Sequence, residues 1–271
     1  MGVFGLFITA FAWAGPTVEP SFDARLAITG WRPGAELVAR PGMKIGLWNN
    51  PESALFNDTY ARFEADIQGS QTALKMGART TFAPIAWFDL SLHGGWQHDF
   101  ATFDSAVSFD SADATYGEFE EMLDQPSQAA SKGWYFGGAT TLKGRLGPTL
   151  FLLGAELTHW GIDSAPAGDW LFDRGNELLL HKQNENVLHG NAAWLFPFGF
   201  GSVNLRLGVA GTYRRALASE DQLLRAGLMF SLGHGGQRWN HHLIAQAYLI
   251  DRAYAQPFPP YLAYQIRFTL N

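Results

Sequence analysis

The last eleven residues of the chain, Tyr261 to Asn271, alternate between apolar and polar side chains almost without interruption. The two sets fall on opposite parities: Leu262, Tyr264, Ile266, Phe268 and Leu270 against Ala263, Gln265, Arg267, Thr269 and Asn271. Because side chains in a β-strand have a period of two, this segment predicts one strand with an apolar face and a polar face.

The same alternation recurs along the chain, in segments separated by Gly, Pro, Asn and Asp. The clearest segments are 61–68, 74–82, 88–93, 203–210 and 224–231, and further candidates lie near 22–31, 36–48, 133–143, 148–160, 186–196 and 239–251. Together with the terminal segment they predict twelve strands. Ten and fourteen strands are alternatives, because boundaries read from alternation carry errors of several residues.

The composition excludes several classes of protein. No run approaches the roughly 20 apolar residues of a membrane-spanning helix, which excludes a helical membrane protein. Aromatic residues make up 14% of the chain and charged residues only 16%, which fits a surface that partly faces lipid. The absence of cysteine excludes disulfides, thiolate metal sites and a lipoprotein anchor. A net charge of -6 argues against nucleic-acid binding, which needs a basic face.

The first fourteen residues form a short apolar stretch that ends in Ala12-Trp13-Ala14, an A-x-A cleavage pattern. We interpret residues 1–14 as a secretory signal peptide and residues 15–271 as a single exported domain. The basic region that usually precedes the apolar stretch is missing, so a buried N-terminal segment is the alternative.

The connections between the expected strands sort by length. The two longest, near 99–132 and 161–177, fall on one side, whereas those near 84–85, 144–147, 197–200 and 233–238 are brief and fall on the other. Segment 49–57 is the one longer connection on the side of the brief ones. Bacterial outer-membrane barrels have an even strand number, with long loops outside and short turns inside. With the export signal and the aromatic terminal strand, the mature chain resembles this class over nearly its whole length, although no particular family is indicated.

This resemblance implies an all-β, transmembrane, antiparallel up-and-down β-barrel in the cell outer membrane. It also implies contact with outer-membrane lipid and lipopolysaccharide, and assembly by the outer-membrane machinery. The sequence does not determine the oligomeric state.

If the apolar faces point to lipid, charged side chains line the interior, and basic groups outnumber acidic ones there. The expected pore-lining residues are Arg62, Glu64, Lys75, Arg79, Glu156, Arg206, Arg225 and Arg267. Carboxylates gather instead in segment 99–132, namely Asp104, Asp110, Asp113, Glu118, Glu120 and Glu121. We expect this segment to fold into the barrel mouth as an acidic constriction. The pattern therefore predicts a passive, porin-like channel for small solutes or ions.

Two other functions stay open. Salt bridges could fill the interior of a twelve-stranded barrel, which would make it a closed structural or partner-binding protein acting through its external loops. A membrane hydrolase is the second alternative, because Asp89, Ser91 and His93 share one strand face and would place a nucleophile beside a base. Their order is unfavourable, since the acid lies beyond the serine. No spacing specifies a metal site or a nucleotide motif, so no cofactor is expected.

Overall fold

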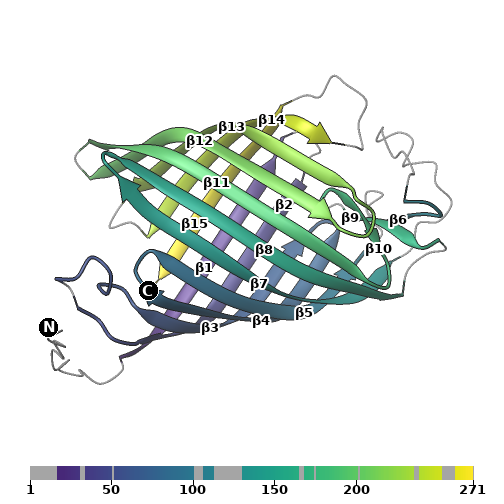
Figure 1. The fold of residues 1–271 in the computed structure, drawn as a ribbon, viewed down its shortest axis with the longest axis horizontal. Helices are drawn as coiled ribbons and strands as arrows, with labels where there is room; N and C mark the ends of the chain where they lie inside the picture. The colour runs from purple at the N-terminus through teal and green to yellow at the C-terminus, as the bar shows by residue number, and fades with distance from the viewer. Residues whose placement is uncertain are drawn as a thin grey trace, which may run out of the picture.

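The computed structural model describes residues 17–30, 34–50, 52–100, 106–112, 130–164, 168–173, 175–200, 202–234, 238–251 and 260–270. Twelve long strands form the barrel wall (Figure 1): β1 (Val18–Thr29), β2 (Gly34–Gly46), β3 (Tyr60–Ser70), β4 (Ala73–Ile85), β5 (Phe88–Asp99), β7 (Ser131–Leu146), β8 (Thr149–Ser164), β11 (Glu185–Phe200), β12 (Val203–Ala216), β13 (Gln222–His234), β14 (Trp239–Asp251) and β15 (Tyr261–Leu270). No helix in these ranges has the length and apolarity that crossing a membrane would require.

Each wall strand pairs antiparallel with the next, and the first pairs with the last. The closing register runs from Phe22 opposite Leu270 to Thr29 opposite Ala263, so the alternating terminal segment does seal the barrel. Every one of the twelve expected segments corresponds to one wall strand. The prediction of a closed antiparallel barrel of about twelve strands is confirmed.

Burial alternates along the wall strands. In β5 the side chains of Leu90, Leu92 and Trp96 are exposed on the outside, whereas Ser91 and Gln97, on the opposite parity, are buried. The outer surface is thus apolar around the barrel, with exposed leucine, phenylalanine and tryptophan on nearly every strand. Only helices and closed barrels satisfy their backbone within lipid, and an apolar exterior of this extent needs lipid to cover it. The barrel therefore belongs in the cell outer membrane, with lipid against this surface.

The two ends of the barrel differ in their connections. The strand ends that flank segments 100–130, 165–184, 217–221 and 252–260 lie at one end of the barrel, here named the loop end. Most connections at the other end, the turn end, are short, such as 86–87 and 147–148; segment 47–59 is longer. Long connections of such barrels lie outside the cell, so we expect the loop end to be external. The expected signal peptide at 1–14 lies outside the described residues.

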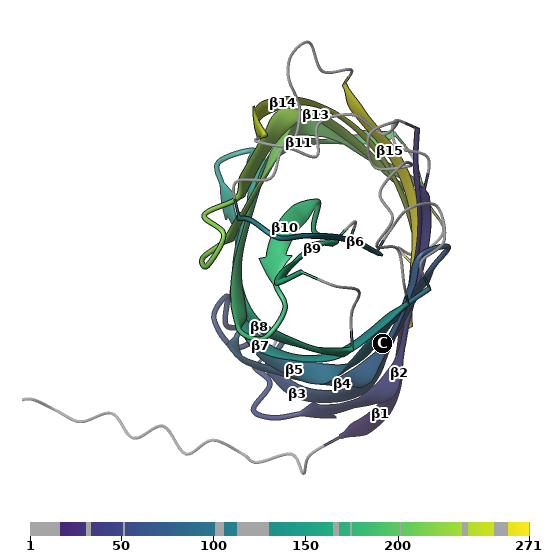
Figure 2. The same ribbon diagram turned by 90° about the vertical axis from the view of Figure 1, so that its right-hand side faces the viewer.

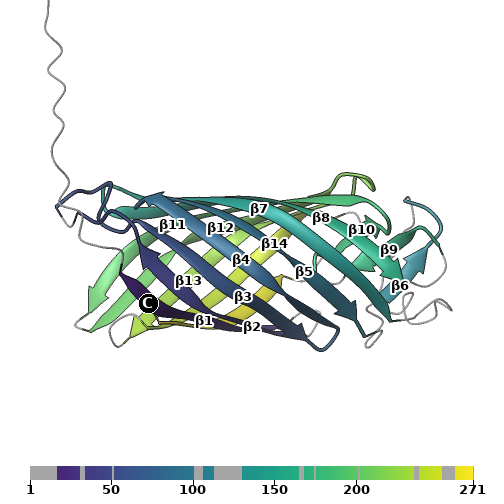
Figure 3. The same ribbon diagram turned by 90° about the horizontal axis from the view of Figure 1, so that it is seen from below.

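Three short strands form a separate sheet that sequence analysis did not predict. They are β6 (Ala106–Phe109), β9 (Trp170–Asp173) and β10 (Leu178–His181), in the order β10-β9-β6. Viewed onto the loop end, this sheet lies within the outline of the wall (Figure 2), and the side view from below places it at that end alone (Figure 3). We call this sheet and the turn at 175–177 the plug.

Glycines allow neighbouring wall strands to approach closely. Gly77 in β4 and Gly95 in β5 lie opposite each other in the register. A Cβ added to Gly95 would lie 2.2 Å from the carbonyl oxygen of Met76, and one added to Gly77 would lie 2.2 Å from that of Gly94. Glycine in a strand often marks a tight bend of a barrel. The oval cross-section of Figure 2 requires such bends.

Candidate functional site

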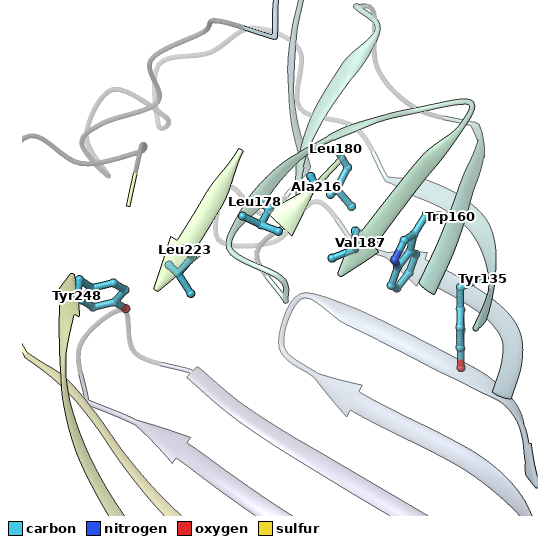
Figure 4. Packing of buried hydrophobic residues seen from close by; sticks show 8 residues of the cluster. All are labelled: Tyr135, Trp160, Leu178, Leu180, Val187, Ala216, Leu223 and Tyr248. Carbon is cyan, nitrogen blue, oxygen red and sulfur yellow. The ribbon is translucent and has the colours of Figure 1, made fainter. Parts of the chain in front are cut away.

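The plug packs against the inner wall through an apolar core (Figure 4). Leu178 and Leu180 of β10 are fully buried, with 0% and 1% of their surfaces exposed. Their partners come from six strands across half of the wall, namely Tyr135, Trp160, Val187, Ala216, Leu223 and Tyr248. On the opposite face of the plug sheet, Leu179, Phe172 and Val107 form a second cluster. Both faces of β10 are therefore covered, as in a protein core.

Buried acidic side chains tie the plug backbone to the wall. The amide of Leu179 donates to Asp221 Oδ2 at 2.8 Å, and the Ser219 hydroxyl donates to the Leu179 carbonyl at 2.6 Å. Glu185, which is fully buried, accepts from the amides of His181 at 3.0 Å and Ala218 at 2.9 Å. These bonds satisfy polar groups that would otherwise be buried without partners. Asp221 and Glu185 thus hold β10 in register with the wall.

Beyond β10, the side chain of Lys182 is also buried. Burial lowers the pKa of this lysine, and the carboxylates of Asp169 and Asp110 oppose the shift. The same region contains backbone bonds from the Lys182 amide to the Asp169 carbonyl at 3.0 Å and from the Ile162 amide to the Lys182 carbonyl at 2.6 Å. Through Lys182, the chain that follows β10 is therefore hydrogen-bonded to β8.

Glu177, in the plug turn, contacts two arginines and a tyrosine of the wall. Arg225 Nη1 donates to Glu177 Oε2 at 2.8 Å, Arg214 Nη1 lies 3.7 Å from the same oxygen, and Tyr248 donates to Oε1 at 3.2 Å. Glu177 has a φ of 56°, a left-handed conformation that costs a non-glycine residue about 1–2 kcal/mol. We name Glu177, Arg214, Arg225 and Tyr248 the Glu177 cluster.

Arginine stacking and backbone contacts complete the Glu177 cluster. The Arg225 guanidinium lies 3.9 Å from the centre of the Tyr261 ring, and only 4% of its side chain is exposed. Arg214 Nη1 donates to the carbonyls of Gly175 and Asn176 at 3.1 and 2.9 Å. The two guanidinium groups are thus held in place by contacts beyond Glu177 itself.

Beneath the plug, one row of the wall register carries a polar network. Glu64, Arg79, His93, Gly137 and Thr158 are successive neighbours on β3, β4, β5, β7 and β8. His93 Nε2 lies 3.3 Å from the Thr158 hydroxyl across the intervening glycine, so a side chain at position 137 would block this contact. The row lies within the barrel and brings together groups that are distant in sequence.

Ion pairs between neighbouring strands occupy the rest of the interior. Arg40 Nε donates to Asp66 Oδ1 at 2.9 Å, and Asp66 is almost completely buried. Arg267 Nε donates to Asp23 Oδ2 at 3.0 Å across the closing seam between β15 and β1. Pairing of this kind offsets the cost of removing charges from water.

The expected pore-lining residues all lie on inward-facing positions, but at different heights. Lys75 and Arg225 lie at the plug, where the Lys75 ammonium is 4.4 Å from the centre of the Trp160 ring. Arg62, Glu64, Arg79 and Glu156 belong to the network beneath it; Arg62 Nη1 is 3.8 Å from Glu64 Oε1. Arg267 lies at the seam, and Arg206 lies on β12 toward the turn end.

The acidic loop is described only in part. Asp104, Asp113, Glu118, Glu120 and Glu121 lie outside the described residues, and Asp110 is exposed just beyond β6. Segment 99–132 contributes β6 to the edge of the plug, but the part of the plug that packs on the wall comes from segment 168–184. The acidic constriction stays a prediction.

The hydrolase candidates have separate partners. Ser91 Oγ accepts from Arg79 Nη2 at 2.7 Å, and Asp89 pairs with Lys143 at 3.0 Å. His93 Nε2 points to Thr158 and lies 3.7 Å from Glu156 Oε1. Within these contacts Ser91 and His93 do not form a nucleophile–base pair.

Sequence reasoning singled out Arg225 but missed Glu177, Arg214 and Tyr248, the other members of the Glu177 cluster. Arg214 continues the inward parity of Arg206 on β12, so extending the alternation beyond residue 210 would have found it. Glu177 lies in a turn whose conformation has no periodic signal, and nothing in the sequence pattern indicates its position.

Replacing Asp66 with alanine should destabilise the barrel by about 3–5 kcal/mol, because the change leaves Arg40 charged and unpaired in the interior. The measurement is urea unfolding of the refolded protein in lipid vesicles, followed by tryptophan fluorescence. Asp58→Ala is the matched control: Asp58 pairs with Lys44 at 3.0 Å, but 53% of its side chain is exposed. That change should cost at most about 1 kcal/mol. An equal decrease in the free energy of unfolding in the two variants would contradict a structural role for the buried Arg40–Asp66 pair.

No protein-family model and no curated protein matches the sequence. Among solved structures, the β domain of the Bordetella autotransporter BrkA aligns with 11% identity and a TM-score of 0.45, over 94% of this chain and 99% of that one. The translocator domain of the autotransporter NalP from Neisseria meningitidis aligns with 12% identity and a TM-score of 0.42, over 94% and 86%. An outer membrane channel from Pseudomonas putida F1 aligns with 8% identity and a TM-score of 0.36, over 99% and 100%. The strand pairing described above, rather than these distant likenesses, establishes the chain as a twelve-stranded barrel of the outer-membrane class.

Proposed function

We propose that the protein is an outer-membrane channel for small solutes whose passage is controlled by the plug. The observation that carries the proposal is the unequal filling of the interior. At the loop end, the plug buries its leucines against the wall. At the turn end, inward-facing side chains stay open to water, with 49% of Arg267, 38% of Lys143 and 40% of Leu152 exposed.

The polar interior supports this proposal. Rings and ladders of charged side chains are the usual means by which a pore selects ions and polar solutes. Arg79, His93 and Glu156 lie beneath the plug, where a solute entering past a displaced plug would meet them. The plug comes from two connections between wall strands, β5 to β7 and β8 to β11, so its displacement leaves the pairing of the wall intact.

The test is single-channel conductance in planar bilayers of the refolded mature chain and of a variant in which a short Gly-Ser linker replaces residues 168–183. We expect rare or small openings for the intact chain and steady, larger conductance for the variant. Reversal potentials under a salt gradient should shift toward cations when Arg79→Gln is added to the variant. A variant that inserts and is heat-modifiable, yet conducts nothing, would overturn the channel.

A closed, partner-binding barrel is the second candidate. The nearly complete burial of Leu178, Leu179 and Leu180 favours it, because burial of this extent is typical of a permanent core. The same conductance measurement separates the candidates: the closed barrel predicts that the intact chain never opens at any voltage or solute concentration.

A further inference from the structure

In the Glu177 cluster two guanidinium groups face one carboxylate. Their positive charge exceeds its negative charge, and their N–H donors outnumber its acceptor atoms. Arg214 and Arg225 face the single carboxylate of Glu177. The Nε groups of both arginines are buried and have no acceptor among the residues that the structure describes. Because buried donors are nearly always satisfied, donors left over at this point indicate a site with capacity for a further acceptor.

Arg225 is positioned by the wall independently of Glu177, whereas Arg214 also donates to the plug carbonyls of Gly175 and Asn176. Tyr261 stacks on the Arg225 guanidinium at 3.9 Å, and Tyr248, Arg214 and Arg225 all project from strands of the wall. Glu177 instead enters from the plug, on a turn in a left-handed conformation. The part of the cluster that lies on the wall is therefore cationic and aromatic, and the anionic part is carried on the plug.

We propose that Arg214, Arg225 and Tyr248 form a binding site for the carboxylate of a small organic acid, and that Glu177 occupies this site while the plug is docked. The inference rests on the proposed channel function and names its solute class. Arginine forks bind carboxylates with two parallel hydrogen bonds, and the Tyr248 hydroxyl donates a further one. The adjoining Tyr261 ring and Leu223 side chain offer apolar contact to the carbon skeleton of such an acid.

In this arrangement the solute and Glu177 compete for the same donors. A carboxylate solute that takes the site displaces Glu177 and removes one attachment of the plug. Conversely, the docked plug lowers the apparent affinity for the solute, because the site is free only in the fraction of molecules whose plug is displaced. Solute binding and plug release are then two readouts of one equilibrium.

Calorimetric titration of succinate into the refolded protein in detergent tests the site directly. We expect Glu177→Gln to bind succinate at least tenfold more tightly than the unmodified chain, because its competitor is neutral. Adding Arg225→Gln to Glu177→Gln should abolish this binding. Adding Arg145→Gln should leave it unchanged, because Arg145 is exposed at the turn end and donates to the Gly147 carbonyl. Heat-modifiable mobility on electrophoresis confirms that each variant is folded.

Failure of the site and failure of the channel give different results. If folded Glu177→Gln does not bind succinate, or binds it equally without Arg225, the carboxylate site is overturned whatever the conductance. If succinate binds as expected but opens no channel in bilayers, the site stands and the channel proposal fails. If succinate both binds and raises the open probability of the intact chain, and Arg225→Gln removes both effects, the proposal is supported.

Discussion

Replacing Leu178 and Leu180 together with alanine should release the plug from the wall while the barrel stays folded. Truncating a fully buried leucine costs about 2–5 kcal/mol, so the pair should weaken docking by at least about 4 kcal/mol. That loss lowers the ratio of closed to open molecules roughly a thousandfold. In planar bilayers, the variant should therefore open far more often than the unmodified chain.

The control for this variant is Leu228→Ala. Leu228 is 62% exposed and lies on the lipid-facing side of β13, so its truncation should leave the open probability unchanged. A double-leucine variant that stays closed, with normal heat-modifiable mobility, would mean that the hydrogen bonds of Asp221, Ser219 and Glu185 hold the plug without its apolar core.

Replacing Gly95 with valine should prevent the barrel from closing. The first added carbon would overlap the Met76 carbonyl oxygen at 2.2 Å, and the obstructing atom is backbone, which cannot rotate away. Overpacking in a well-packed region commonly costs about 1–3 kcal/mol, and a backbone clash lies at or above that range. Refolding into vesicles should yield little or no protein with the mobility of a closed barrel on unheated gels.

Gly199→Val is the matched control, because an added Cβ at Gly199 meets no atom within 4 Å. This variant should refold with an unchanged yield, since valine favours strands where there is space for it. Equal yields for the two valine variants would show that the wall can relax at Gly95 and that the bend does not depend on glycine there.

The wall could be predicted from the sequence because lipid outside and water inside impose the same alternation on every strand. The expected segment 186–196 is part of β11, Glu185–Phe200, and 133–143 is part of β7, Ser131–Leu146. Errors are confined to strand ends, where the alternation weakens. The plug strands escaped prediction for a physical reason: Leu178, Leu179 and Leu180 are all buried, so β10 has no polar face to alternate with. Four residues are also too few to establish a period.

Only those site residues that lie on the wall strands could be predicted from the sequence. Parity along a strand predicts that Arg62, Glu64 and Arg79 share one face, and in the structure Glu64 lies opposite Arg79 in the register. Parity does not reveal which residues meet across strands, because the stagger of a barrel sets the height of each one. Contacts such as His93 with Thr158, or Arg225 with Glu177, depend on that stagger and on a turn conformation. The acidic loop has a clear signal in the sequence, its clustered charge. The plug is built mostly from apolar residues and has no such signal.

The apolar core of the plug has a consequence for the order in which the molecule is assembled. Its wall partners begin with Tyr135 on β7 and end with Tyr248 on β14, with Tyr261 of β15 packed beside them. Leu178 and Leu180 therefore lack their full set of packing partners until β14, the second-to-last strand, has paired with the wall. Most of these wall partners follow β10 in the chain. We expect the mouth to close only as the seam between β15 and β1 forms, so that a barrel halted short of that step is an open one.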